Sequence, residues 1–284
     1  MEKTYTYLIP CLLGLEKLVG DEVKRLGLRE VQVENGRILC RGTLADCARL
    51  NINLRCGARV ILVLGQFPAV SFEELFQGVK AIAWEDYLDS HAAFPVKGYS
   101  ISSQLHSVPA CQSIIKKAVV ERLAARYGLA QLPEDGVKHQ IRFSIMKDAV
   151  AIGLDTSGEG LYKRGYRAVG VEAPLRETLA AALVQLSRYR GRDPFCDPFC
   201  GSGTIPIEAA LIARNRAPAV FTVPAEAAHI RHLEADVLLH PRQGRVVPGD
   251  LDGVGVYVAA PDIIVAAELL VLGLVGGVQP AIGR

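Results

Sequence analysis

Residues 196–216 read CDPFCGSGTIPIEAALIARNR, and this stretch predicts how the chain around it folds. The order of residue types predicts a strand that ends at Asp197, followed by two glycines that allow a sharp turn and bring backbone amides close to a ligand. The apolar run after the glycines predicts a helix, with Thr204 as its cap, Pro206 in its first turn and Glu208 near its positive end. A strand, a glycine turn and a helix N-terminus form the first unit of a doubly wound, nucleotide-type fold.

The two glycines, Gly201 and Gly203, leave the class of ligand open. A phosphate-binding loop of the G-x-x-x-x-G-K-[ST] type needs a lysine after the glycines, and only the first half of the dinucleotide pattern G-x-G-x-x-G is matched. An acid at the strand end instead suits a cation, so Asp197 can hold an ammonium group directly or through water. S-adenosylmethionine fits this pattern, because it carries an ammonium and a sulfonium but no phosphate. A tight turn without any ligand is the alternative.

Composition predicts a folded protein of two or three domains. The chain has 284 residues, half of them hydrophobic, and its formal net charge of +2 does not by itself indicate a nucleic-acid partner. Of the seven cysteines, five are scattered without zinc spacing, namely Cys11, Cys40, Cys47, Cys56 and Cys111, so we expect buried free thiols in a reducing, cytoplasmic setting. Glu2 and the lack of a long apolar core near the N-terminus argue against a signal peptide.

The first part of the chain alternates between strand and helix patterns. The expected elements are a strand at 4–10, a helix at 14–27, two strands within 29–42, a helix at 43–54 and a strand at 58–67. Asn35 and Gly36, between the two short strands, form a strong hairpin signal, and Thr43 is expected to cap the second helix. The order β-α-β-β-α-β predicts a ferredoxin-like domain over residues 1–67.

A second, more basic unit is expected over residues 68–157. Its elements are a helix at 71–84, a strand at 96–104, an amphipathic helix at 110–127 and two strands joined near Lys147 and Asp148. Between Lys97 and Arg167 the sequence has eleven Lys or Arg residues against six Asp or Glu residues. This excess indicates either binding of a polyanion or a solvated helix face. A glycine-rich basic turn follows, and Pro174 then opens a helix that runs to Tyr189.

Three further segments accompany the opening motif in a recognisable order. They are SSQLHSVPACQSIIKKAVVERL at 102–123, GLYKRGYR at 160–167 and APLRETLAAALV at 173–184. Together with DPFCGSGTIPIEAALIA at 197–213, they resemble the THUMP-domain class I RNA methyltransferase family, which contains the bacterial 23S ribosomal RNA guanine-N2 methyltransferases. The resemblance covers about residues 4–217. It implies an α+β N-terminal region, ferredoxin-like plus THUMP, followed by the start of an α/β Rossmann-like methyltransferase domain.

The resemblance also implies a division of roles between the domains. The N-terminal domains would bind structured RNA, which in this family is ribosomal RNA, while the catalytic domain would bind S-adenosyl-L-methionine and a flipped-out base. The cofactor-binding candidates are Asp197, Phe199, Gly201, Gly203 and Thr204. The RNA-binding candidates, which would contact phosphates, are Lys116, Lys117, Lys163, Arg164 and Arg167. No catalytic residue is assigned.

The family pattern is expected to stop after Ala217. Relatives continue into an acid-tipped strand that holds the ribose and later carry an N-P-P-Y tetrapeptide, whereas this chain has no asparagine after Asn215. GDLDG at 249–253 lacks the surrounding strand and helix pattern, and no lysine occurs over 218–284. We therefore expect a methyltransferase domain, over 158–217, that is truncated or frameshifted, with a helix after the glycines that has little to pack on. An RNA-binding THUMP fragment without catalysis is the alternative function.

Two features of the tail admit other interpretations. Residues 263–282 are almost wholly apolar, but Glu268 and Pro280 interrupt them, so a membrane span is not expected. A loose set of possible metal ligands comprises Glu226, His229, His232, Asp236 and His240. Because no H-E-x-x-H or comparable motif is present, we expect no metal there.

Overall fold

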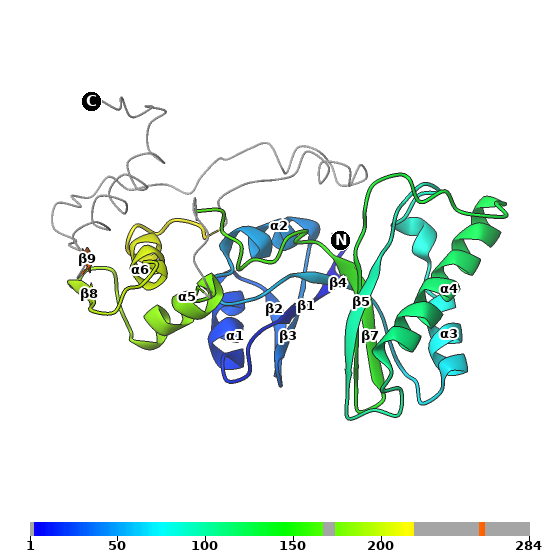
Figure 1. Ribbon diagram of the computed structural model, residues 1–284, viewed down its shortest axis with the longest axis horizontal. Coiled ribbons are helices and arrows are strands. Elements are labelled where there is room, and N and C mark those ends of the chain that lie inside the picture. Colours follow the sequence, from blue (N-terminus) through cyan, green and yellow to red (C-terminus); the bar gives the residue numbers. More distant parts are fainter. Residues whose placement is uncertain (1–2, 167–173, 219–255, 259–284) are drawn as a thin grey trace.

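The computed structural model describes residues 3–166 and 174–218, together with the backbone of a short strand at 256–258 (Figure 1). Within these residues the strands form one seven-stranded sheet, in the order β2-β3-β1-β4-β7-β6-β5, and one pair, β8-β9. The large sheet combines the two N-terminal units, and the pair belongs to the segment that contains the glycine turn.

The first unit has the ferredoxin-like order predicted from the sequence. Its elements are β1 (Tyr5–Pro10), α1 (Glu16–Arg25), β2 (Arg29–Glu34), β3 (Arg37–Gly42), α2 (Leu44–Asn53) and β4 (Ile61–Pro68). All neighbouring strands in it are antiparallel. The hairpin turns at Asn35 and Gly36, and Thr43 caps α2 through a capping box with Asp46.

The second unit adds three strands to the same sheet. Its elements are α3 (Phe72–Lys80), the short 3-10 helix η1 (Trp84–Asp86), β5 (Val96–Ile101), α4 (Val108–Tyr127), β6 (Ile141–Met146) and β7 (Ala149–Asp155). β7 pairs antiparallel with β4 along its whole length and so joins the two units, while β5 and β6 are parallel. This continuous seam was not expected from the sequence, which shows two separate patterns.

Alternation along β4 decides which face of the sheet the helices cover. Leu62 belongs to the core under α1 and α2, whereas Ile61 and Val63 belong to a small cluster on the opposite face. Leu154 on β7 is the direct partner of Leu62 and belongs to the core under α3 and α4. Cross-strand partners point to the same face. The helices α1 to α4 therefore all cover one face and leave the other without a helix.

The helix-free face is concave. In the sheet, β3 and β6 are separated by β1, β4 and β7, which would place them about 19 Å apart if the sheet were flat. Nevertheless, Nη1 of Arg37 on β3 donates to Oγ of Ser144 on β6 over 3.1 Å. The sheet must therefore bend around this face, and Figure 1 shows α1 on the outer side of one group of strands and α3 and α4 on the outer side of the other.

The third segment contains α5 (Glu177–Leu186), β8 (Phe195–Asp197), α6 (Thr204–Ala213) and β9 (Val256–Val258). The predicted strand, turn and helix are present, and β8 also has a parallel partner in β9 that the sequence did not suggest. The expectation that α6 would have little to pack on is wrong. Pro206 and Ala209 are buried, and Ala181 and Ala182 of the neighbouring α5 enter the ferredoxin-like core.

The remaining predictions about the tail fall outside the described residues. These are the apolar stretch 263–282 and the set of five possible metal ligands at 226–240. Over the ranges that are described, no helix is both long and apolar enough to cross a membrane. The same ranges contain no group of three or more His, Cys, Asp or Glu side chains that could hold a metal ion.

Candidate functional site

The bend between β8 and α6 is built by one acid and two left-handed glycines. Asp197 ends β8, and its Oδ1 accepts a hydrogen bond from the backbone amide of Phe199 over 3.1 Å. Gly201 and Gly203 have φ values of 52° and 72°, a region that glycine occupies at little cost. The amide of Gly203 donates to the carbonyl of Cys200 over 2.8 Å. Asp197 therefore holds the start of the bend, and the glycines turn it into α6.

The bend is open to a ligand. Among the described residues, a Cβ placed on Gly201 would meet nothing closer than the Phe199 carbonyl oxygen at 4.0 Å, and Phe199 is 93% exposed. The second carboxylate oxygen of Asp197, Oδ2, is buried and has no hydrogen-bond partner among the described residues. A buried carboxylate oxygen without a donor is costly, so this atom is suited to receive one from a bound cation.

Two predictions about α6 are wrong. The N-cap is Gly203, not Thr204, because the left-handed bend extends one residue further than expected. Thr204 is the first helical residue, and its hydroxyl lies 3.0 Å from that of Ser202. Glu208 does not act on the open helix end, since its side chain is fully buried one turn into the helix.

The prediction that Arg164 contacts phosphate is also wrong. Its side chain is 1% exposed, and its Nε donates to Oε1 of Glu208 over 3.2 Å. Its Nη atoms donate to the carbonyls of Leu54 and Arg55 over 3.4 and 2.6 Å. The hydroxyl of Tyr166 donates to the same Glu208 oxygen over 3.1 Å. Burial raises the pKa of the Glu208 carboxyl although these donors favour its charged form.

Glu22 of α1 provides the second half of this junction. Its Oε2 accepts from the backbone amides of Arg55 and Cys56 over 3.2 and 3.1 Å. Its Oε1 accepts from Nε2 of Gln185 on α5 over 2.5 Å, and Arg25 donates to Oε1 of Gln185 over 3.2 Å. The ferredoxin-like unit thus contacts α5 through Glu22. It is linked to α6 by Arg164, which bonds both to carbonyls of this unit and to Glu208. These contacts position the bend between α5 and α6.

The remaining RNA-binding candidates are Lys116, Lys117, Lys163 and Arg167, and Arg167 lies outside the described residues. The other three do not form one patch. Lys116 forms an ion pair with Glu134 and lies over the ring of Phe94 at 3.6 Å, so it is engaged within its own unit. Lys117 and Lys163 are 67% and 55% exposed. The first is on α4 and the second follows β7, beside the ferredoxin-like unit.

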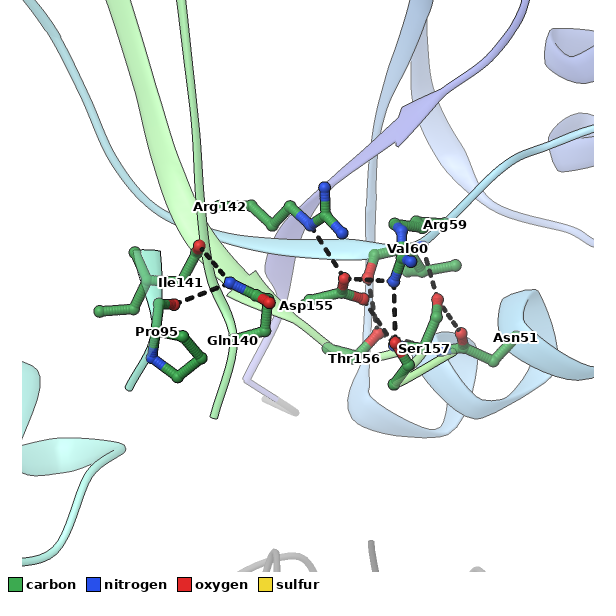
Figure 2. A network of polar contacts seen from close by, with 11 residues as sticks. Asn51, Arg59, Val60, Pro95, Gln140, Ile141, Arg142, Asp155, Thr156 and Ser157 are labelled. Atoms are coloured by element: carbon green, nitrogen blue, oxygen red, sulfur yellow. Dashed lines mark hydrogen bonds and ion pairs between the residues drawn. The ribbon is translucent and has the colours of Figure 1, made fainter. Parts of the chain in front are cut away.

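Sequence reasoning missed a groove of about 500 Å³ on the concave face. Arg59, Lys97 and Arg142 line it together with apolar residues of β1 and β4. Figure 2 shows the polar network at one end of it, centred on Asp155. Lys97 and Arg142 lie in the basic segment that the charge count had singled out, but their proximity to Arg59 depends on the β4–β7 seam.

The fold and the bend together define a class of multidomain protein, in which two N-terminal α+β units precede the first strand, turn and helix of a doubly wound domain. A ferredoxin-like unit shares a sheet with a second α+β unit, and an acid-tipped strand, an open glycine bend and a helix follow. Three family models match in that order: the RlmL ferredoxin-like domain at residues 6–61, the THUMP domain at 69–155 and the RMKL-like methyltransferase domain at 164–251. The last match runs past Ala217, where we expected the family pattern to end.

Relatives agree with these matches. The chain is 46% identical over 218 residues to "Putative RNA methyltransferase YpsC" of Bacillus subtilis, covering 76% of this chain and 56% of that protein. It is 35% identical over 216 residues to ribosomal RNA large subunit methyltransferase K/L of Psychromonas ingrahamii, covering 75% of this chain and 28% of that protein. The crystal structure of SMU.472, a putative methyltransferase complexed with SAH, is 42% identical with a TM-score of 0.71, over 83% of this chain and 65% of that one.

The chain belongs to the THUMP-domain RNA methyltransferase family, as its motifs predicted. It spans about half of the length of one of these curated relatives and little more than a quarter of the other.

Proposed function

We propose that this chain binds S-adenosyl-L-methionine at the bend and transfers its methyl group to RNA in the cytoplasm, with guanine N2 of ribosomal RNA as the target. One observation carries the proposal. Asp197 uses one carboxylate oxygen to hold an open glycine bend, while its other oxygen is buried without a partner among the described residues.

The residues at the bend fit the cofactor. The α-ammonium of its methionine end would supply the donor that Asp197 Oδ2 lacks, directly or through water. Gly201 leaves the backbone bare, and the exposed ring of Phe199 offers an apolar surface beside it. Gly203 and Thr204 set the direction in which α6 leaves the bend. The crystal structure of the similar protein SMU.472 was determined as a complex with SAH, the demethylated form of the cofactor, and this supports the assignment.

Bound there, S-adenosylmethionine would present a methyl group on a sulfonium, open to attack by a nucleophilic nitrogen. The contribution of this chain is to hold the methionine end through Asp197 and to fix the bend against α5 and α6. The buried contacts of Arg164 and Glu208 keep α6 in place, so they act on the geometry of the bend and touch no substrate.

An RNA substrate is supported by the THUMP match and by the relatives named for RNA and ribosomal RNA. A target amine on a base inside a duplex is out of reach, so a base that is unpaired or flipped out would have to enter the site. Guanine N2 is the target that the family resemblance implies.

A second candidate is RNA binding without methyl transfer. It is favoured by the sequence after residue 215, which contains no asparagine and therefore no N-P-P-Y tetrapeptide to hold the target amine. In this case the N-terminal units would still bind RNA.

Incubation of the chain with tritiated S-adenosylmethionine and large-subunit ribosomal RNA separates the two candidates. The proposal predicts labelled RNA whose nucleoside digest contains N2-methylguanosine. Label on another nucleoside would refute the guanine-N2 assignment alone. RNA that binds in a gel-shift assay but takes up no label would favour the second candidate.

A further inference from the structure

The groove on the concave face lies where the two N-terminal units share their sheet. Leu8 of β1 and Ile61 and Val63 of β4 supply apolar lining, and residues of β5, β6 and β7 form the rest. Its volume of about 500 Å³ is within the range of small-ligand sites. It therefore has room for a nucleotide or two, whereas a double helix is too wide to enter.

The lining of the groove is positively charged. The described residues that line it include three cations, Arg59, Lys97 and Arg142, and no Asp or Glu side chain. Lys97 and Arg142 are direct cross-strand partners in the parallel β5–β6 pair, so both side chains leave the same face of the sheet. Within the described part of the chain, Lys97 is not engaged in an ion pair, which leaves its charge available to an anion.

One carboxylate orients two of the three cations. Oδ2 of Asp155 accepts from Nη1 of Arg59 over 2.6 Å and from Nε of Arg142 over 3.1 Å. The side chain of Asp155 is fully buried, so it fixes the orientation of both guanidinium groups from within the protein. One terminal nitrogen of Arg142 points away from that carboxylate (Figure 2). Three positive charges against one negative charge leave +2 at this end of the groove.

Further hydrogen bonds hold this end in place. Arg59 also donates to the carbonyl of Gly158 over 2.8 Å. Ser157 accepts from the amide of Val60 over 2.8 Å and donates to Oδ1 of Asn51 over 2.6 Å (Figure 2). The arginines are therefore fixed by strands and loops of both units, which makes them a preorganised anion site.

An aromatic side chain lies next to the cations. Tyr99 lines the groove, is 37% exposed, and follows Lys97 by two residues on the same strand, so both point to the same face about 6.6 Å apart. Cations that hold a phosphate beside an aromatic ring that stacks on a base are the usual elements of single-strand recognition.

We infer that this groove binds one or two unpaired nucleotides of RNA, with the phosphate on Lys97, Arg59 and Arg142 and a base against Tyr99. This inference rests on the proposed function, because it assumes that RNA is the substrate. It assigns the groove as the surface that holds an unpaired end or loop of that RNA. The sequence-based candidates lie elsewhere, on α4 and in the linker after β7.

The test measures binding of the full chain to a fluorescein-labelled, unstructured six-nucleotide RNA by fluorescence anisotropy, without cofactor, over a range of salt concentrations. The variants are Lys97→Gln and Tyr99→Ala, whose side chains are exposed. Lys24→Gln is the matched control, because it removes one exposed charge from α1 on the helix-covered side of the sheet. Lys97→Arg keeps the charge and tests for rescue.

Lys97→Gln should weaken binding several-fold and lower the slope of log affinity against log salt by about 0.7, the value for one phosphate contact on a single strand. Tyr99→Ala should weaken binding about fivefold or more through lost stacking. Lys24→Gln should leave affinity and slope unchanged, and Lys97→Arg should restore most of the affinity.

The inference is overturned if Lys97→Gln and Lys24→Gln behave alike, if the six-nucleotide RNA does not bind, or if a blunt RNA duplex binds more tightly and with the same sensitivity to Lys97. Its failure is distinct from failure of the proposed function. A chain that binds no S-adenosylmethionine would refute methyl transfer, but the anisotropy readout uses no cofactor and would be unaffected.

Discussion

Replacing Arg164 by leucine should destabilise the whole chain more than any exposed substitution, because the change leaves a buried acid without its cation. Arg164 is 1% exposed and donates to Glu208, which is itself fully buried. Removing one partner of a buried pair costs about 3–5 kcal/mol. The carbonyls of Leu54 and Arg55 also lose their donor, so the upper half of that range is expected.

Urea denaturation of the wild type, Arg164→Leu, and the double variant Arg164→Leu with Glu208→Met measures this cost. The double variant removes the stranded carboxylate and should recover about 2 kcal/mol or more relative to the single variant. A single variant that loses less than about 1 kcal/mol, a loss typical of surface sites, would refute the reasoning. So would a double variant less stable than the single one.

The pH dependence gives a second readout of the same pair. Burial holds the pKa of Glu208 above its unfolded value, so the folded state binds the extra proton. The stability from this group is fully present below the unfolded pKa and is lost as pH rises through the folded pKa. Arg164→Leu should raise that pKa further, because the nearest positive charge is gone. The deficit of the variant should therefore grow as pH rises above the unfolded pKa of a glutamate, because the carboxyl then ionises, and it should shrink as pH falls below that value.

Three further predictions concern the bend, the seam and the thiols. Gly201→Ala should lower the free energy of unfolding by about 1 kcal/mol and weaken cofactor binding, because a φ of 52° is unfavourable for alanine. An unchanged affinity for S-adenosylmethionine in calorimetry would contradict this. Gly153→Ala should lower the free energy of unfolding, measured in urea, by about 3 kcal/mol. The added Cβ would lie 1.9 Å from the carbonyl oxygen of Leu62 and would push β4 away from β7. An unchanged free energy of unfolding would show that the β4–β7 pairing is loose. In the native state at pH 8, iodoacetamide should label exposed Cys196 and spare Cys40, whose pKa burial raises to about 12; mass spectrometry showing early labelling of Cys40 would contradict its burial.

Local patterns predicted local structure well. The hairpin at Asn35 and Gly36, the cap at Thr43 and the strand that ends at Asp197 follow from residues that lie within a few positions of one another. Such features depend on turn geometry and hydrophobic period, which a single sequence displays. The ferredoxin-like order followed from the same patterns, and the family from motifs of fixed spacing.

Features that depend on distant residues could not be predicted in the same way. Arg164 is basic and lies in a glycine-rich turn, so it resembles an exposed phosphate contact until Glu208, 44 residues later, is found beside it. The groove requires Arg59 and Arg142 to meet at Asp155 across the β4–β7 seam, and the sequence shows no signal for that pairing. The N-cap is Gly203 and not Thr204, because the left-handed backbone continues through Gly203, and the sequence does not show how far such a bend extends.

The affinity of the chain for S-adenosylmethionine, measured by isothermal titration calorimetry with the wild type and Asp197→Asn, tests the central claim most directly. The account predicts micromolar binding by the wild type and a loss of about tenfold or more in the variant, since the amide removes the charge that holds the ammonium, with little change in the thermal midpoint. Equal affinity in the two proteins, or no heat of binding in the wild type, would contradict it.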